Sequence, residues 1–209
     1  IGGNVGKRFA AGGYHTVLCR RSDEEGLNLL VAEIEAAGDS ATGYLLNAVE
    51  EGSIEACVAA VEEEHGPIEV VIYNLGAQIG DRPLAETSYK AFEMGWQLAT
   101  FGLFRTASAV CPKMEARGKG VIMVTSATAA VRGNAGQHSH AAAMGGRRML
   151  CQTLNAQFAK KGIHVAHVLI DGMVDAPDTL GKMLGSELFQ QLRGQRGGAQ
   201  DGLMLPQQM

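Results

Sequence analysis

The sequence predicts an α/β fold in which a doubly wound parallel sheet forms the middle of three αβα layers. Short apolar runs alternate with amphipathic helical patterns along almost the whole chain, which is the sequence sign of βαβ units. Glycine is abundant, at 28 of 209 residues, which suits a fold with many tight turns between strands and helices. A chain of this length can bury one large core, so we expect a single domain over residues 1–209.

In the first part of the chain, His15–Cys19 is predicted to be a short buried strand. Ser22–Ala37 is predicted to be a helix, because apolar residues recur at three- and four-residue spacing. Ser22 and Glu25 have the spacing of a capping box at its start, and Gly38 is placed to end it.

The middle of the chain continues this alternation. Thr42–Leu46 is predicted to be a weak strand, Ser53–His65 an amphipathic helix and Ile68–Tyr73 a buried strand. A long helical stretch, Ser88–Ala116, follows, and we expect it to bend near Pro112 because proline removes a backbone donor.

In the last part, Val121–Thr125 and Val165–Ile170 are predicted strands on either side of a helix over His140–Lys160. After Asp175 the pattern fades, and Gly194–Gly202 is predicted to be a loop. In such a fold the ligand crevice lies at the carboxyl ends of the strands.

One part of this fold is absent from the sequence. A glycine-rich loop follows the central strand of a doubly wound sheet, whereas Gly2 and Gly3 are almost the first residues here. Without a central strand its two neighbours would be left unpaired. We therefore expect a further strand ahead of Ile1 and a chain that is incomplete at both ends.

Composition excludes several classes of function. The net charge of −4 and the pI near 5.9 argue against a nucleic-acid-binding protein, which would carry a basic face. No stretch approaches the roughly 20 apolar residues of a membrane span. His138 and His140 have no suitably spaced acidic or cysteine partner, so we predict no metal site. The scattered cysteines indicate reduced thiols and a cytoplasmic protein: Cys19, Cys57, Cys111 and Cys151.

The segment Val121–Arg148 combines a buried strand, a Thr/Ser/Ala turn, a Gly-rich loop and a helix of small residues. This layout resembles the active-site half of the short-chain dehydrogenase/reductases. The resemblance extends over nearly the whole chain and implies a Rossmann-type fold. In that family a helix Asn, a Ser at the strand end, and a Tyr and a Lys on the next helix support hydride transfer to a carbonyl. The matching positions here are Ala99, Ala127, His140 and Met144.

These four substitutions argue against the family's ordinary mechanism. His140 is the candidate proton donor, because imidazole can donate a proton near neutral pH. Arg148 lies one helical turn beyond Met144 and is the candidate source of positive potential. Ser126 is one residue from the Ser position, so it can serve only if the strand has already ended there. The alternative is a catalytically inactive member that acts as a nucleotide sensor, a scaffold or a partner subunit.

The resemblance also implies a nicotinamide cofactor. Arg20 and Arg21 lie where the fold meets the adenosine ribose, and arginines suit a 2′-phosphate, which favours NADP(H) over NAD(H). The other candidate cofactor residues match the family's Gly-rich turn, its adenine contact, the end of the next strand and the segment beside the nicotinamide. In that order they are Gly2, Gly3, Asn4, Val5 and Gly6; Asn47 and Ala48; Asn74 and Gly76; and Gly172 and Val174.

The partners implied by the resemblance are a small carbonyl or alcohol substrate and further copies of the chain. In this family the two long helices pair across symmetry axes to form a homodimer or homotetramer. Small or apolar residues on the corresponding helices are candidates for that packing: Ala107, Val110, Ala142, Gly145 and Gly146.

Overall fold

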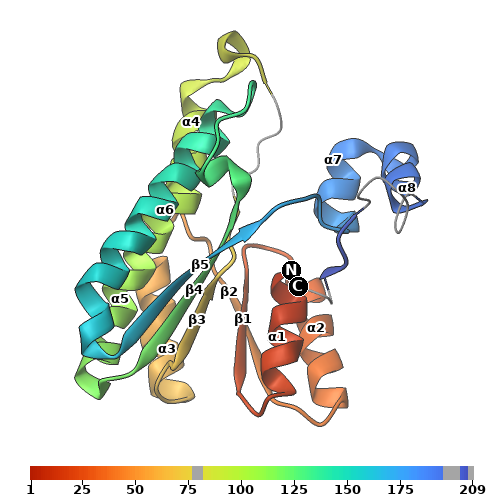
Figure 1. The fold of residues 1–209 in the computed structure, drawn as a ribbon. Helices are drawn as coiled ribbons and strands as arrows, with labels where there is room; N and C mark the ends of the chain where they lie inside the picture. Colours follow the sequence, from red (N-terminus) through yellow and green to blue (C-terminus); the bar gives the residue numbers. More distant parts are fainter. Residues whose placement is uncertain (77–81, 195–202, 207–209) are drawn as a thin grey trace.

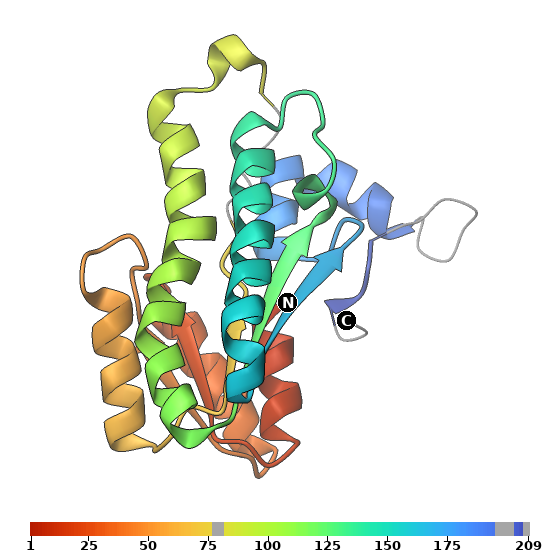
Figure 2. The same ribbon diagram turned by 60° about the vertical axis from the view of Figure 1, so that its left-hand side comes forward.

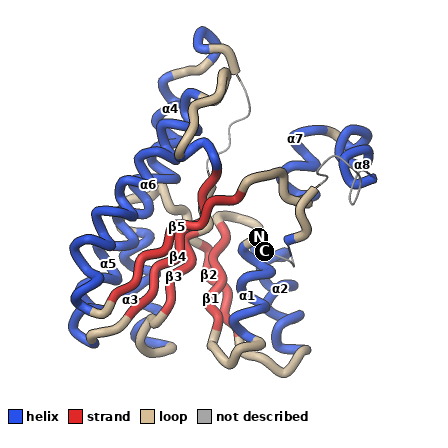
Figure 3. The backbone as a smooth tube through the Cα atoms, in the orientation of Figure 1, coloured by secondary structure: helices blue, strands red, loops and turns tan. Residues whose placement is uncertain are grey.

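The computed structural model describes residues 1–76, 82–194 and 203–206 and has the predicted α/β class (Figure 1). The paired strands of these residues are parallel and form two sheets (Figure 3). In the first, β1 (Thr16–Arg20) pairs with β2 (Ala41–Leu45). In the second, β4 (Gly120–Ala127) lies between β3 (Val70–Tyr73) and β5 (Ile163–Ile170). The strands predicted between His15 and Ile170 are therefore confirmed, with ends shifted by a few residues.

Helices α1 (Gly2–Ala10) and α2 (Glu24–Ala36) pack on the β1–β2 sheet. Helices α3 (Ser53–Glu64), α5 (Gly102–Arg117) and α6 (His138–Phe158) cover one face of the other sheet, with α4 (Tyr89–Trp96) ahead of α5 (Figures 1 and 2). Two short helices, α7 (Lys182–Leu184) and α8 (Ser186–Gly194), follow β5. The main core lies between α5, α6 and the three-stranded sheet and includes Leu103, Val110, Met114, Ile122, Val124 and Ile163.

The start of α2 differs from the predicted capping box. The N-cap is Asp23, whose side chain accepts a hydrogen bond of 3.0 Å from the Gly26 N–H. Ser22 lies one residue outside this position. Both residue types cap helices well, so local preference alone does not decide between two adjacent candidates.

The long helical stretch is also interrupted at a place that the sequence did not predict. Pro112 lies inside α5 and does not end it, whereas Gln97–Phe101 between α4 and α5 form a π-helical turn. The π-helical turn lies near the ends of β3 and β4: the Tyr73 hydroxyl donates to the Leu98 carbonyl at 2.5 Å, and Arg147 donates both to the Ala99 carbonyl in the turn and to the Thr125 carbonyl of β4.

The single doubly wound sheet that we expected is not continuous in the structure. β1 pairs only with β2 and β3 only with β4 among the described residues. A cavity of about 900 Å³ has residues of both β1 and β3 in its lining. Each of these strands therefore has one edge without a strand partner in the described part of the chain. The strand expected ahead of Ile1 stays a prediction.

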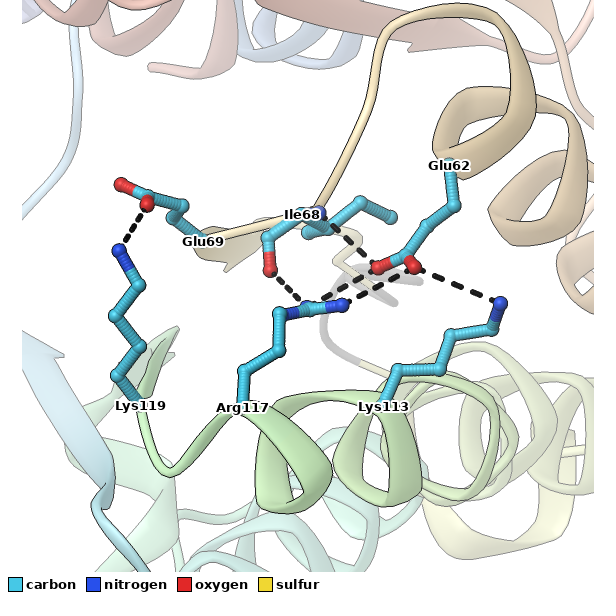
Figure 4. A network of polar contacts seen from close by, with 6 residues as sticks. All are labelled: Glu62, Ile68, Glu69, Lys113, Arg117 and Lys119. Atoms are coloured by element: carbon cyan, nitrogen blue, oxygen red, sulfur yellow. Dashed lines mark hydrogen bonds and ion pairs between the residues drawn. The ribbon is translucent and has the colours of Figure 1, made fainter.

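A network of charged side chains joins α3, α5 and the amino end of β3 (Figure 4). Glu62 accepts hydrogen bonds from both terminal nitrogens of Arg117, at 3.1 and 3.2 Å, and from the Ile68 N–H at 3.0 Å. Lys113 Nζ lies 3.5 Å from the same carboxylate, and Arg117 also donates to the Ile68 carbonyl at 2.9 Å. Burial raises the pKa of Glu62, but these hydrogen bonds and charges outweigh it and hold the pKa below its usual value.

We expect Glu62→Gln to lower the free energy of unfolding at pH 7 by about 1–2 kcal/mol, because it removes a charge-assisted bond of a largely buried carboxylate. Since the folded pKa is the lower one, this stabilisation is present above the unfolded pKa of roughly 4.3 and is lost as the pH falls below it. Urea unfolding from pH 7 to pH 3 measures both effects. Glu69→Gln is the matched control, since its pair with Lys119 is exposed and screened by solvent, so its loss should change the stability much less. Equal losses in the two variants would contradict the prediction.

Candidate active site

Most of the predicted cofactor residues meet at one cavity. The cavity between β1 and β3 is lined by Gly2, Gly3, Val5, Gly6, Arg20, Arg21, Asn47, Ala48 and Asn74. Residues Asn4, Gly76, Gly172 and Val174 are not among its lining residues. The cavity follows β1 and β3 along their whole length, so residues at the carboxyl ends of both strands line it together.

The expected Gly-rich turn over Gly2–Gly6 is wrong in conformation, because these residues form the first turns of α1. The start of this helix lies against the end of β3: a Cβ added at Gly2 would come within 3.2 Å of Asn74 Nδ2. The first N–H groups of a helix have no acceptor within the helix, so this end suits an anionic group.

The two arginines at the end of β1 differ in their surroundings. Arg20 forms an ion pair with Asp23, the residue that caps α2. No such ion pair holds Arg21, which is exposed and has no side-chain partner among the described residues. Arg21 is therefore the one better placed to receive a phosphate. The three-residue spacing of Arg20 and Asp23 was the sequence signal for this pair.

The backbone of the candidate adenine segment is fixed by two side chains. Ser53 Oγ donates to the Asn47 carbonyl at 2.6 Å, and Arg105 Nη1 donates to the Ala48 carbonyl at 2.9 Å. Glu55 holds Arg105 through two hydrogen bonds of 2.9 and 2.6 Å, and these bonds lower the pKa of Glu55. The segment is thus positioned by α3 and α5 together.

The four positions that carry the family's catalytic side chains are largely apolar. Ala99 is fully buried, and it packs in a small cluster with Met144, which is 2% exposed, and with Ala127 at the end of β4. His140 lies half-buried at the start of α6. An apolar cluster supplies neither a proton relay nor a charge to a reacting carbonyl.

Ser126 lies within β4, which continues to Ala127, so the condition under which Ser126 could replace the missing serine is not met. Its side chain is buried, and its hydroxyl lies 3.6 Å from Met144 Sδ. Ser126 is therefore brought beside the position that corresponds to the family's lysine, but its contact there is a weak acceptor.

The sequence interpretation assigned positive potential to Arg148, which is only half-buried. Its neighbour Arg147 is 1% exposed and donates hydrogen bonds to backbone carbonyls at the site. Sequence reasoning missed Arg147. The available signal was its spacing: it follows Ala143 and Met144, both buried, by four and three residues on α6.

The segment predicted to lie beside the nicotinamide follows β5. Gly172 has a φ of +153°, in a region that L side chains seldom adopt, and a Cβ there would lie 3.1 Å from the Met204 side chain. Val174 forms a parallel bridge with Met204. Asp175 is buried and forms an ion pair with Arg193 of α8, at 2.8 Å. This segment is therefore tied to the last part of the described chain.

Within the described ranges, no group of three or more His, Cys, Asp or Glu side chains is placed to hold a metal ion. None of the helices in the described part is both long and apolar enough to cross a membrane.

Comparison with protein families matches residues 1–182 to the model described as short chain dehydrogenase. A 2-dehydro-3-deoxy-D-gluconate 5-dehydrogenase of Formosa agariphila is 28% identical over 165 residues, which are 79% of this chain and 62% of that protein. The short-chain reductase protein NovJ of Streptomyces niveus is 31% identical over 90% of this chain and 71% of its own. The chain thus spans somewhat under two thirds of the length of the first of these relatives.

Solved structures of short-chain dehydrogenases also resemble this chain. A short-chain dehydrogenase from Rhodopseudomonas palustris superposes with a TM-score of 0.77 at 33% identity, over 97% of this chain and 91% of that one. A gluconate 5-dehydrogenase from Burkholderia cenocepacia, solved with NADP and tartrate, has a TM-score of 0.79 at 21% identity, over 92% and 74% of the two chains. At that identity the second likeness concerns the fold alone.

Proposed function

Because this chain belongs to the short-chain dehydrogenase family, we propose that it binds NADP(H) as an oxidoreductase-type protein with an altered active site. The observation that carries the cofactor preference is the pair of arginines at the end of β1. Arg21 is exposed beside the cavity with no side-chain partner in the described chain, and a guanidinium binds a phosphate through paired hydrogen bonds.

The residues around the cavity fit the dinucleotide in other respects. The start of α1 at Gly2 suits the diphosphate, and the Asn47–Ala48 backbone is held rigid beside the cavity. Asn74 lies near Gly2 at the end of β3. When bound, the cofactor supplies or accepts the hydride that a carbonyl or alcohol substrate exchanges.

A fluorescence titration with NADPH, with NADH in parallel, tests this proposal. Saturable binding that prefers NADPH would support it. Binding of neither cofactor would contradict both the oxidoreductase and the nucleotide-sensor readings, and a scaffold or partner-subunit role would take their place.

We expect Arg21→Ala to weaken NADPH binding about tenfold or more while changing NADH binding little, because a charge-assisted bond to the 2′-phosphate contributes about 1.5–3 kcal/mol. Arg20→Ala is the matched control and should have a smaller effect, since Asp23 already pairs with Arg20. The dissociation constants of both cofactors for the two variants decide the matter. An equal loss of affinity for NADPH and NADH would show that Arg21 does not bind the 2′-phosphate.

For the chemistry we propose two alternatives. In the first, His140 donates the proton to a substrate carbonyl and the protein is a weak reductase. In the second, the protein is catalytically silent and serves as a nucleotide sensor, scaffold or partner subunit. The packing of Ala99, Ala127 and Met144 in one apolar cluster favours the second. Turnover of a panel of small carbonyl compounds by the natural protein and by His140→Ala separates them: unchanged turnover, or none in either protein, would remove His140 as the acid.

We also propose that the chain forms a homodimer or homotetramer in the cytoplasm. Two of the residues expected at the interface, Ala107 and Val110, instead face the core, at 2% and 0% exposure. Gly146 packs against Thr100 of the same chain, since a Cβ there would meet Thr100 Oγ1 at 3.0 Å. An exposed row of aromatic side chains, Trp96, Phe101 and Phe104, lies on the outer side of the same helices and supports self-association.

All four cysteines are free thiols, and burial raises the pKa of Cys111 and Cys151 to about 11. Such thiols are unreactive near neutral pH.

A further inference from the structure

Arg147 is among the most completely buried large side chains of the described chain. It lies on α6, one helical turn after Met144, on the face that meets the strand ends. A buried arginine is uncommon, because removing a charge from water costs several kcal/mol unless the protein compensates it.

Three backbone carbonyls from three different segments accept hydrogen bonds from this guanidinium. Nε donates to Ala99 in the π-helical turn at 2.9 Å, and Nη1 donates to Thr125 of β4 at 2.6 Å. Nη2 donates to Leu75, just past the end of β3. The guanidinium also lies over the Tyr73 ring, 5.2 Å from its centroid.

These partners orient the guanidinium but do not neutralise it. Carbonyls and an aromatic ring are dipoles and a quadrupole, and no carboxylate of the described residues forms an ion pair with Arg147. Burial lowers the pKa of Arg147, but a guanidinium titrates so far above neutrality that it stays protonated. A full positive charge is therefore fixed under the carboxyl ends of β3 and β4.

We propose that Arg147 is the positioning residue that supplies the fixed cation of this site, and that its charge makes the site bind the reduced nicotinamide cofactor in preference to the oxidised one. The inference rests on the proposed function, because it requires that the cofactor binds. Arg147 acts through the potential and the strand ends that it holds, and it is too buried to touch a ligand itself.

The physical reason is the difference in charge between the two forms of the cofactor. The oxidised nicotinamide ring carries a positive charge that the reduced ring lacks, while the phosphates are the same in both. A buried cation repels the oxidised ring, and the low permittivity around it preserves that repulsion. Backbone carbonyls favour a nearby cation, but the carbonyls of Ala99, Thr125 and Leu75 are directed at Arg147.

The test compares the dissociation constants of NADP⁺ and NADPH for the natural protein, Arg147→Met and Arg147→Lys. We expect the natural protein to bind NADPH more tightly, and Arg147→Met to reduce the ratio of the two constants about tenfold. Arg147→Lys keeps the charge, so the ratio of the two dissociation constants should stay close to that of the natural protein even if the melting temperature of this variant is lower. Arg148→Met is the matched control; it removes a more exposed charge and should change the ratio by less than about twofold.

A second readout needs no cofactor. The pKa of His167 on β5 is lowered by burial, and further by the charges of Arg147 and Arg148. The His167 pKa, followed by NMR, should therefore rise in Arg147→Met and stay low in Arg147→Lys. If Arg147 had only a structural role, the substitutions would change the melting temperature, but the His167 pKa would not differ between Arg147→Met and Arg147→Lys.

The outcomes distinguish this inference from the proposed function. Equal ratios in the natural protein and in a folded Arg147→Met would overturn the inference while NADP(H) binding stands. Binding of neither form by the natural protein would overturn both. If Arg147→Met does not fold, the natural protein decides: a preference for NADPH that persists at high salt supports a buried charge, and the absence of a preference refutes it.

Discussion

Replacing Gly162 by alanine is expected to cost about 4 kcal/mol or more of the free energy of unfolding, a large part of the roughly 5–15 kcal/mol by which native proteins are stable. Gly162 follows the end of the α6 region with a φ of +81°, and a Cβ at this position would lie 1.9 Å from the carbonyl oxygen of Gly118. That oxygen is backbone at the end of α5. The Gly120 N–H donates to the Gly162 carbonyl at 3.1 Å, so the two loops cannot separate without breaking the start of the β4–β5 pairing.

Gly38→Ala is the matched control for this prediction. Gly38 also ends a helix, with a φ of +87°, but nothing lies within 4 Å of its added Cβ. This variant pays only the left-handed backbone strain of about 1 kcal/mol. Urea unfolding followed by circular dichroism compares the three proteins. Similar losses in the two variants would mean that the approach of the α5 and α6 loops is looser than the structure indicates.

Phe104→Glu is expected to raise the dimer dissociation constant at least a hundredfold and to leave a folded monomer. Trp96, Phe101 and Phe104 are 43%, 40% and 52% exposed, and their rings stack at centroid distances of 5.3 and 6.3 Å. Aromatic side chains at the centre of an interface often contribute 2 kcal/mol or more each. A carboxylate placed among them would have to be buried without a partner.

Sedimentation at micromolar concentration measures this effect. Leu29→Glu is the control, because Leu29 is 62% exposed on α2, far in the fold from the aromatic row. Phe104→Leu should restore most of the association. A natural protein that sediments as a monomer, or a Phe104→Glu variant that remains dimeric, would remove the aromatic row as the interface.

The strands were predictable from the sequence because an apolar run such as Val70–Tyr73 needs burial on both faces wherever it lies. The ends of the helices were harder to predict from the sequence. Asp23 and Ser22 are adjacent residues with the same capping chemistry, and only the path of the chain from β1 decides which of them meets the first N–H groups. The position of the π-helical turn depends on tertiary contacts that no local pattern records.

The candidate site, too, could be predicted from the sequence only in part. Residues at the ends of β1 and β3, which the sequence proposed as cofactor contacts, line one cavity, and their role there stays a prediction. The direction of single side chains was not predictable. Arg147 and Arg148 are neighbours about 100° apart on the helix, and the carbonyls that select Arg147 come from segments up to 72 residues away in the chain. The Gly2–Gly6 segment failed for a related reason, since a Gly-rich run is compatible with both a loop and a helix start.

The π-helical turn at Gln97–Phe101 determines in which directions the side chains and carbonyls of the long helix point. Residues five apart on a regular α-helix point about 140° away from each other, yet Trp96 and Phe101 stack on one side of this one. On the opposite side the same wide turn presents the Leu98 and Ala99 carbonyls to the Tyr73 hydroxyl and to Arg147. Deleting one residue from this turn would therefore change the directions of the outer aromatic side chains and of the two inner carbonyls together. Evolutionary change in the exposed aromatic row is therefore constrained, through this single turn, by what the interior can tolerate.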